Sequence, residues 1–328
     1  MNLINILTEE IGAFFSLEGL IGIIQSGDYS SLRTWDGITK AISPLIPFIL
    51  LLEISVASLN RKIHSGEYRI PLLIYVFNRF AGRFISFGLV AFCIGWLQPL
   101  AIFQLSWNWY GFILGYIAWE FAHFIYHYLA HKVRLFWCLH STHHAPEHMN
   151  LSVTYAHFLL EAPYADFIRT SLCILAGVPP EMLFVIMFID GTWGAFIHIG
   201  ANVLKDASLG WVGKIILTPS HHRVHHARNP LYMDTNFCNL LNIWDKIFRT
   251  YQPEKKEINI EYGITRPINA KNFWDVYFGE IYHLVKDVAQ APGIRNKLLY
   301  LVMPPGWSHE GNHKTASSVR KAWLINQP

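Results

Sequence analysis

The hydrophobic residues of this chain gather in long runs, and most charged residues lie in the segments between them. One run, from Phe84 to Leu105, holds 22 residues and no charge. Because about 20 apolar residues in a helix cross the hydrocarbon core of a bilayer, this run predicts a transmembrane helix. A second span is predicted from about Ala41 to Leu59, interrupted by Glu53, and a third begins near Trp107.

A further apolar region runs from Leu172 to Ile199 and is broken by Pro179 and Pro180, which predicts a hairpin of two short or re-entrant helices. The segment Glu9–Ile24 carries three glutamates, so a helix lying in the membrane interface suits it better than a span. We therefore expect an all-α integral membrane protein with about four transmembrane helices.

Composition agrees with this fold class, since 52% of the 328 residues are hydrophobic and 15% are charged. We expect three parts: an N-terminal part with the first two spans (1–105), a membrane-associated domain (106–251) and a soluble C-terminal tail (252–328). The net charge of +3 is too small to indicate a nucleic-acid partner. The four cysteines are scattered, with no metal or disulfide spacing.

Basic residues predict the orientation of the spans. The loop between the first two spans holds five lysines and arginines against one glutamate, so it should face the cytoplasm. The third helix then returns to the same side with Lys132 and Arg134 at its end. This topology fits the endoplasmic reticulum of a eukaryote or the inner membrane of a bacterium.

Thirteen of the seventeen histidines lie between His123 and His226, most of them in three sets. Spacings of three and four residues place side chains on one face of a helix, and neutral imidazole is the commonest metal ligand in proteins. Eight imidazoles are too many for one ion and suit two. The sequence therefore predicts a dinuclear metal site on these residues: His127, His131, His140, His143, His144, His222, His225 and His226.

Other residues near these sets have two possible roles. His198 ends an apolar segment and is a ninth candidate ligand, or else a hydrogen-bonded core residue. His123 extends the stripe of His127 and His131 by one turn, whereas His148, His157 and His221 suit supporting or surface positions. A metal-bound imidazole needs its other nitrogen held by a carboxylate or carbonyl, and the candidate holders are Glu120, Asp234 and Asp245.

The ligand set alone does not choose among iron, zinc and copper. A non-catalytic metal-binding membrane protein would need the same histidines. A zinc-dependent membrane hydrolase is a further alternative, although no carboxylate base lies inside the motifs. The chain carries no G-x-G-x-x-G or P-loop motif, so electrons for redox chemistry should come from an external donor.

The histidine sets resemble those of the integral-membrane fatty acid hydroxylase/sterol desaturase superfamily, from Glu120 to Ala145 and again over residues 218–226. The similarity extends to its alkylglycerol monooxygenase branch through Phe196-Ile-His198, residues 243–248 and residues 262–267. Lys132 departs from that branch, which has a glutamate after the second histidine. This difference leaves the ether-lipid substrate and the tetrahydrobiopterin reductant open.

The resemblance implies a cytosol-facing non-haem site with two ferrous ions, held by the eight motif histidines and His198. It implies an O2-dependent attack on a lipid C–H bond, with an external electron donor for which tetrahydrobiopterin is a candidate. Hydroxylation, desaturation and ether cleavage all occur among such enzymes, so a sterol or fatty acid desaturase or hydroxylase is the alternative within the superfamily.

Overall fold

The computed structural model describes residues 3–27, 29–63, 66–81 and 83–326, and these residues form helices joined by loops. Within these ranges there is no β-strand, and two isolated bridges join Ile216 to Leu241 and Ala227 to Tyr262. The expectation of an all-helical chain is therefore confirmed for the described residues.

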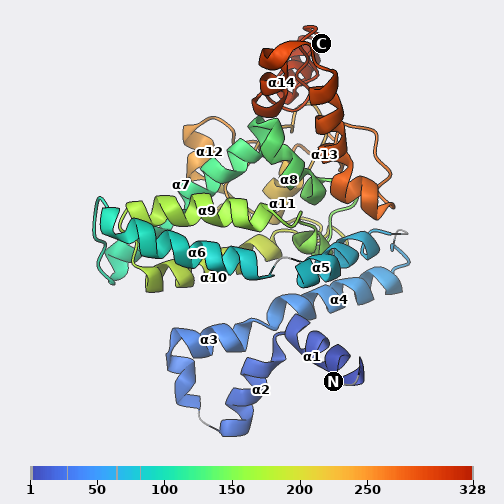
Figure 1. The fold of residues 1–328 in the computed structure, drawn as a ribbon. Coiled ribbons are helices and arrows are strands. Elements are labelled where there is room, and N and C mark those ends of the chain that lie inside the picture. The colour runs from blue at the N-terminus through green and yellow to red at the C-terminus, as the bar shows by residue number, and fades with distance from the viewer. Residues whose placement is uncertain (1–2, 28, 64–65, 82, 327–328) are drawn as a thin grey trace.

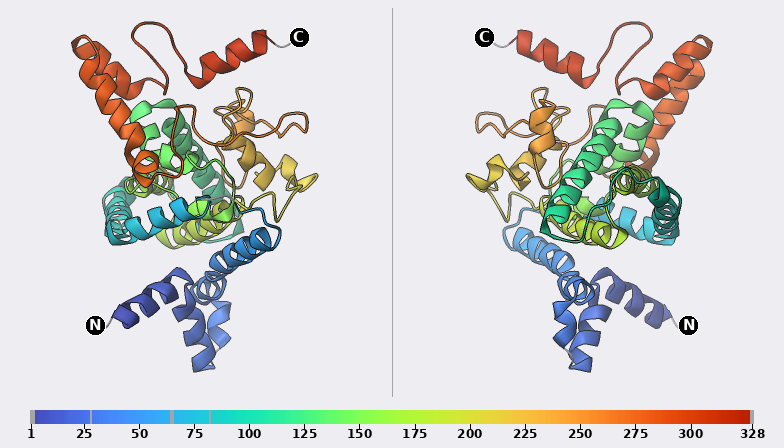
Figure 2. Two further views of the ribbon diagram at one scale, coloured as in Figure 1. Left: turned by 90° about the vertical axis from the view of Figure 1, so that its right-hand side faces the viewer. Right: turned by 90° about the vertical axis from the view of Figure 1, so that its left-hand side faces the viewer.

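The helices follow the chain from one end of the molecule to the other (Figures 1 and 2). Helices α1 to α3 lie at one end, α13 to α15 lie at the other, and the remaining helices form the body between them. Their bounds are α1 Leu3–Phe14, α2 Leu17–Ser26, α3 Trp35–Ile42, α4 Leu45–Leu59, α5 Arg69–Ala81, α6 Arg83–Leu97, α7 Trp109–Lys132, α8 Arg134–His144, α9 Glu161–Leu175, α10 Pro180–Phe196, α11 Pro219–His225, α12 Ile243–Ile247, α13 Phe273–Gln290, α14 Gly293–Val302 and α15 Ala316–Ile325. Four short 3-10 turns connect them: η1 Tyr29–Arg33, η2 Gln98–Leu100, η3 Leu151–Tyr155 and η4 Val212–Lys214.

The apolar core of the body joins α7, α9 and α10. Trp119 of α7, Cys173 and Ile174 of α9 and Met182 of α10 are almost fully buried together. A side chain at Gly115 would place its Cβ 2.9 Å from Sδ of Met182, so α7 and α10 approach closely at this glycine. Close packing is the role that small residues spaced four apart predict, and here it fixes the helix that carries the candidate ligands His127 and His131.

For the hairpin predicted between Leu172 and Ile199, the break at the two prolines and the second helix are confirmed, since Pro179 precedes the first turn of α10. The first helix differs from the prediction, because α9 begins at Glu161 and ends at Leu175. The predicted span from Phe84 to Leu105 is shorter than expected, because α6 ends at Leu97 and Pro99 lies in η2. Beyond it the backbone bonds to the hairpin turn, with Leu105 N–H donating to the Gly177 carbonyl at 2.9 Å.

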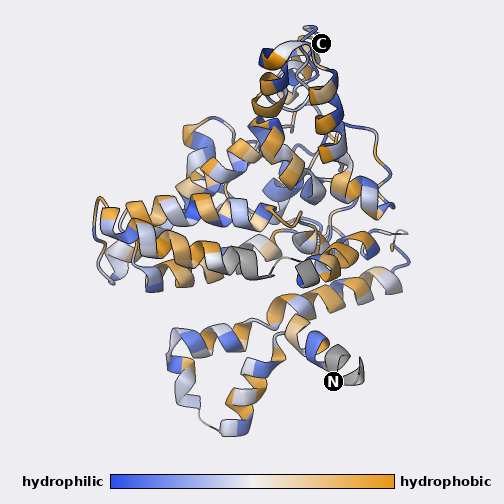
Figure 3. Ribbon diagram, in the orientation of Figure 1, coloured by the Kyte–Doolittle hydropathy of each residue, from blue (hydrophilic) through white to orange (hydrophobic). Residues whose placement is uncertain are grey.

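Among the described residues, one helical stretch is long and apolar enough to cross a membrane, the 25 residues Trp35–Leu59 of α3 and α4. Hydrophobic residues are also frequent along α6 and α10 (Figure 3), but these helices are shorter, with 15 residues in α6 and 17 in α10. Helix α7 has 24 residues and carries polar side chains from its middle onward, beginning with Glu120. The count of four spans thus remains a prediction.

The tail after residue 252 packs against the body through α13 and α14. Cys138 of α8 is buried with Leu284, Ala291 and Tyr300 of the tail. Arg134, at the start of α8, pairs with Asp287 of α13 at 2.5 Å. These contacts fix α8, which carries three of the candidate ligands.

Candidate metal centre

Three helices and one helix end deliver the candidate ligands. Helix α7 carries His127 and His131, α8 carries His140, His143 and His144, and α11 carries His222 and His225 with His226 next. His198 lies two residues past the end of α10. The Thr218 side chain and His221 form a capping box at the start of α11, and Pro219 takes its first position. The local sequence thus begins α11 just before its histidines.

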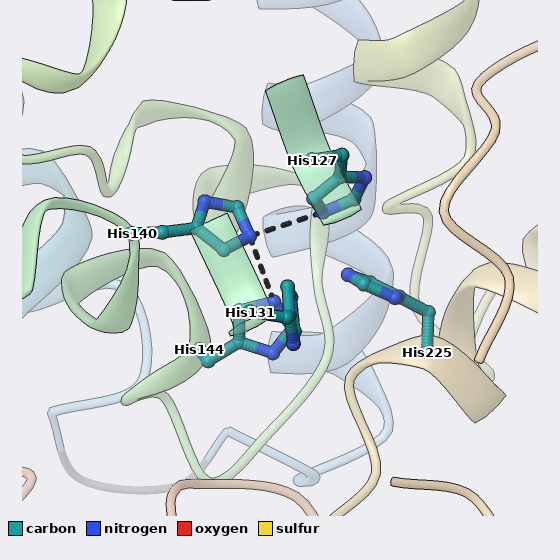
Figure 4. Close-up of side chains that lie close together, drawn as sticks. All are labelled: His127, His131, His140, His144 and His225. Atoms are coloured by element: carbon teal, nitrogen blue, oxygen red, sulfur yellow. Dashed lines mark hydrogen bonds between the residues drawn. The ribbon is translucent and has the colours of Figure 1, made fainter. Parts of the chain in front are cut away.

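Five histidines converge in a first group: His127, His131, His140, His144 and His225. All five are buried, and one ring nitrogen from each lies within 4.8 Å of the others. Nε2 of His140 is 3.0 Å from Nε2 of His127 and 3.0 Å from Nε2 of His144 (Figure 4). Metal–nitrogen bonds of about 2.1 Å hold neighbouring ligand atoms roughly 3 Å apart, so these separations suit one ion.

The second group contains His143, His198, His222 and His226, which are also buried. Nε2 of His198 lies 3.1 Å from Nε2 of His143 and 2.9 Å from Nε2 of His222. Nε2 of His226 lies 3.1 Å from Nε2 of His222. His198 therefore lies with the motif histidines, as one of its two predicted roles requires.

The two groups are neighbours because each H-x-x-H-H motif contributes to both. On α8, His140 and His144 belong to the first group and His143 belongs to the second. The rings of His144 and His226 stack across the boundary with centroids 4.3 Å apart. This arrangement provides two adjacent nitrogen-rich positions, which is the dinuclear geometry expected from the spacing.

The proton positions in the first group leave lone pairs facing each other. Nδ1 of His127 lies 2.9 Å from the Phe237 carbonyl, which can only accept, so the proton of this ring is on Nδ1. Nδ1 of His140 lies 2.5 Å from the Glu161 carboxylate, which holds the proton there in the same way. The two Nε2 atoms, 3.0 Å apart, thus both present lone pairs. A cation between them removes this repulsion.

The same pattern recurs at two other candidate ligands. His198 donates from Nδ1 to the Gly194 carbonyl at 2.6 Å, and His225 donates from Nδ1 to the Thr235 carbonyl at 2.8 Å. Nε2 of His225 is buried and has no hydrogen-bond partner. Carbonyl or carboxylate support of the outer nitrogen is the usual arrangement around a bound metal, so the donor set fits metal ions.

Electrostatics keep these rings in the neutral form that binds metal. Burial, and then the neighbouring imidazoles, lower the pKa of His143, His144, His222, His225 and His226 well below the usual value. These rings therefore stay neutral, and the Glu161 carboxylate contacts Nδ1 of both His140 and His157.

One of the three proposed holders lies beside a candidate ligand. An Asp234 oxygen is 3.5 Å from Nδ1 of His131, and Asp234 also pairs with Lys132. The other two proposed holders are wrong, because they accept hydrogen bonds from backbone groups and not from a candidate ligand. Glu120 accepts backbone N–H groups of residues 239–241, and Asp245 accepts those of Phe237 and Cys238. They hold the loop whose Phe237 carbonyl supports His127.

Sequence reasoning missed Glu161, whereas the supporting position that it allowed for His157 is confirmed. Glu161 supports His140 with one oxygen and lies 2.8 Å from Nδ1 of His157 with the other. The His157 ring stacks on His143 with centroids 4.3 Å apart. The one signal in the sequence was the spacing of four residues between His157 and Glu161.

Two cavities reach the histidines. One of about 240 Å³ is lined by His127 and His140 of the first group and by all of the second group except His226. A smaller one of about 80 Å³ is lined by His131, His144, His225 and His226 together with Lys314 of the tail. Each group can therefore be reached by a small molecule from two directions.

The region that carries this site is similar to a known protein family. Residues 112–250 match the family model described as fatty acid hydroxylase. Alkylglycerol monooxygenase from Homo sapiens is 30% identical over 289 residues, which are 85% of this chain and 62% of that protein. The Danio rerio alkylglycerol monooxygenase is 32% identical over 203 residues, 62% of this chain and 43% of that protein.

A more distant relative is an ornithine lipid hydroxylase from Rhizobium tropici, 28% identical over 162 residues, 49% of this chain and 47% of that protein. This chain thus covers less than two thirds of the length of each of these relatives. No solved structure matches it. The residues that match the family model carry all nine candidate ligands. This region is thus similar to the fatty acid hydroxylase family, and alkylglycerol monooxygenases are among the homologues of the chain.

Proposed function

We propose that this protein is a non-haem di-iron oxygenase that hydroxylates a C–H bond of a membrane lipid with O2. The observation that carries the proposal is the convergence of buried Nε2 lone pairs in two adjacent histidine groups. The relatives support redox chemistry, because they are named monooxygenases and hydroxylases. All nine histidines are assigned as ligands, five to one ion and four to the other.

Two ferrous ions, when bound, would supply the activation of O2 and the removal of hydrogen from carbon. The chain would contribute the rest. Glu161 and the Phe237 carbonyl would keep the inner nitrogens of His140 and His127 unprotonated. Burial would exclude bulk water, and the cavity of about 240 Å³ would hold the reacting carbon near both groups. Each turnover would place one oxygen atom in the lipid and reduce the other to water with two external electrons.

The relatives' names favour a lipid with a small polar head, since they act on alkylglycerols or ornithine lipids. Hydroxylation beside an ether oxygen would give a hemiacetal that separates into an aldehyde and glycerol. Desaturation of an acyl or sterol substrate is the alternative. Tetrahydrobiopterin is the candidate external reductant because of the similarity to alkylglycerol monooxygenases.

We place the protein in the membrane as a multi-pass protein, with the metal centre near the cytoplasmic surface. Large apolar side chains are exposed on several helices of the body, among them Phe48 and Leu52 of α4, Trp96 of α6 and Leu114 of α7. Such exposure favours contact with lipid. Residues 1–105 and the hairpin α9–α10 would be embedded, and the tail from residue 252 would lie in the cytosol.

The test is to purify the full chain in detergent, load it with ferrous iron and measure its metal content. The loaded protein is then incubated with ¹⁸O2, tetrahydrobiopterin and 1-O-hexadecylglycerol. We expect about two irons per chain, as two ligand groups imply, and ¹⁸O in the aldehyde product. Less than one metal per chain would overturn the dinuclear assignment. A lipid product formed without O2, with oxygen from water, would indicate a hydrolase instead.

A further inference from the structure

Small and polar side chains line the larger cavity beside the histidines. Among the described residues, no leucine, isoleucine, valine, methionine or phenylalanine lines it. Alanines and glycines of α9 and α10, such as Ala165 and Gly194, form part of its wall, and most of the rest consists of imidazole rings, Tyr126, Glu161, Arg169, Asp190 and Asn239. Such side chains can hydrogen-bond a polar group of a ligand.

Arg169 of α9 supplies a donor to this cavity. Its guanidinium pairs with Asp166 at 2.8 Å and lies over the rings of Trp119 and Tyr126, at 5.0 and 5.3 Å from their centroids. Three sides of the group are therefore fixed by neighbours. Its Nε is buried and has no hydrogen-bond partner. An unpaired buried donor is costly unless a ligand satisfies it.

His123 and Asp190 supply a second donor and an acceptor. Nδ1 of His123 is 3.6 Å from an Asp190 oxygen, too far for a hydrogen bond, and this nitrogen has no other partner. The other Asp190 oxygen accepts from the Asn239 amide at 2.7 Å, which fixes the carboxylate. A ligand hydroxyl can accept from one of these groups and donate to the other.

The opening of the cavity lies between α9 and α10. Ala162 and Gly191 both line the cavity and are both exposed. No heavy atom lies within 4 Å of the position that a Cβ of Gly191 would take. The two helices also expose large apolar side chains, among them Phe167 and Phe184. Exposed apolar side chains thus lie on these helices, while unpaired hydrogen-bond donors lie in the cavity wall.

We propose that the lipid enters this cavity with its polar head first, and that Arg169, His123 and Asp190 bind a hydroxyl-bearing head. The alkyl chain leaves through the opening between α9 and α10. This inference rests on the proposed function, and it identifies the oxidised carbon as one close to the head rather than in the middle of the chain. An uncharged head suits the site, because the charge of Arg169 is already paired and Asp190 would repel a phosphate.

Binding of two lipids to the full chain in detergent micelles tests the proposal. The first is 1-O-hexadecylglycerol, and the second is the same ether lipid with both hydroxyls methylated. Tryptophan fluorescence gives the dissociation constants, since Trp119 lies beside Arg169. We expect the hydroxylated lipid to bind at least about tenfold more tightly, the effect of one hydrogen bond to a charged group. Equal affinities of the unmodified protein for the two lipids would already overturn the proposal.

Variants then identify the residues responsible. Arg169→Gln and Asp190→Asn should reduce the preference to within about twofold, and Arg169→Lys should keep part of it. Arg134→Gln is the matched control, because Arg134 also pairs with one carboxylate and lies over one aromatic ring, but outside the cavity. If Arg134→Gln reduced the preference as much as Arg169→Gln, the assignment would be wrong. Gly191→Phe at the opening should weaken the binding of both lipids by the same factor.

The position of oxidation separates this inference from the proposed function. Mass spectrometry of the ¹⁸O-labelled product locates the oxygen on the chain. Label in the middle of the chain would overturn the head-first orientation and leave the oxygenase assignment intact. A preference for the hydroxylated head without any O2-dependent product would support the head-first orientation and contradict the oxygenase assignment.

Discussion

The Glu161 carboxylate lies 2.5 Å from Nδ1 of His140, and both side chains are almost fully buried. This contact fixes the proton on the outer nitrogen of the ring and directs the Nε2 lone pair toward His127 and His144. Glu161 is therefore a positioning residue, which would act on a bound metal through His140.

Replacing Glu161 by glutamine should weaken metal binding at the first group. The neutral amide no longer stabilises the Nδ1 proton as a carboxylate does, and loss of such outer-shell support typically costs 10–100-fold in affinity. Competition with a chelator of known affinity measures the change. Glu181→Gln, at an exposed position in α10, is the control. Unchanged affinity at both metals would show that Glu161 has no such role.

His140 and His143, three residues apart on α8, should serve different metals. His140→Ala and His143→Ala are each expected to reduce the metal content from two to about one, because each removes ligands from one group. Elemental analysis with Mössbauer spectra should show different sites lost in the two variants. His313→Ala, at an exposed position in the tail, should keep both metals. Loss of the same site in both variants would contradict the division into two groups.

The metal-free protein should lose stability as the pH falls below about 6.5. The buried histidines of α8 and α11, such as His144 and His225, have pKa values well below the ordinary value of 6.5. The unfolded chain therefore binds more protons than the folded one at lower pH. Their stabilising contribution is complete above pH 6.5 and declines below it, by up to about 1.4 kcal/mol per pH unit for each group.

Thermal unfolding of chelator-treated protein between pH 7.5 and 4.5 measures this dependence. Bound metal should shift the decline to lower pH, since protons then compete with the ion for the nitrogens. His144→Asn should make the decline shallower, because one titrating ring is lost. A melting temperature that stays level or rises as the pH falls would contradict the sign.

Eight of the nine candidate ligands could be predicted because their signal is local, whereas His198 has no such spacing and its assignment depended on the resemblance. A spacing of three or four residues places His140 and His144 on one helix face whatever the rest of the fold does. Contacts between side chains on different helices were not predictable in this way. Glu161 meets His140 through the loop that carries η3, and the sequence holds no periodicity that joins them.

The helix bounds show where hydrophobic pattern alone misleads. The run from Phe84 to Leu105 is uncharged throughout, but Pro99 ends the helix and the following residues bond to the turn between α9 and α10. Glu53 seemed an interruption of an apolar span, and its role depends on two distant backbone groups. A polar residue within an apolar helix indicates a hydrogen-bond partner, but the sequence does not identify that partner.

Glu53 should be essential for the position of α4 on the body. Its carboxylate accepts the backbone N–H groups of Leu151 and Gly200, each at 2.6 Å, and the side chain is 1% exposed. Gly200 follows His198 by two residues, so this contact also orders the chain beside the second histidine group. Glu53→Gln would turn an amide N–H toward one of these donors and leave it unpaired.

We expect Glu53→Gln to lower the free energy of unfolding by about 2–3 kcal/mol, the cost of a lost hydrogen bond to a buried charge. Thermal unfolding in detergent measures the loss, and Glu18→Gln, at an exposed position in α2, should change little. The iron content of folded Glu53→Gln protein is the second readout, and it should fall at the second group before the first. Wild-type stability with wild-type iron content would show that α4 is held by its apolar contacts alone.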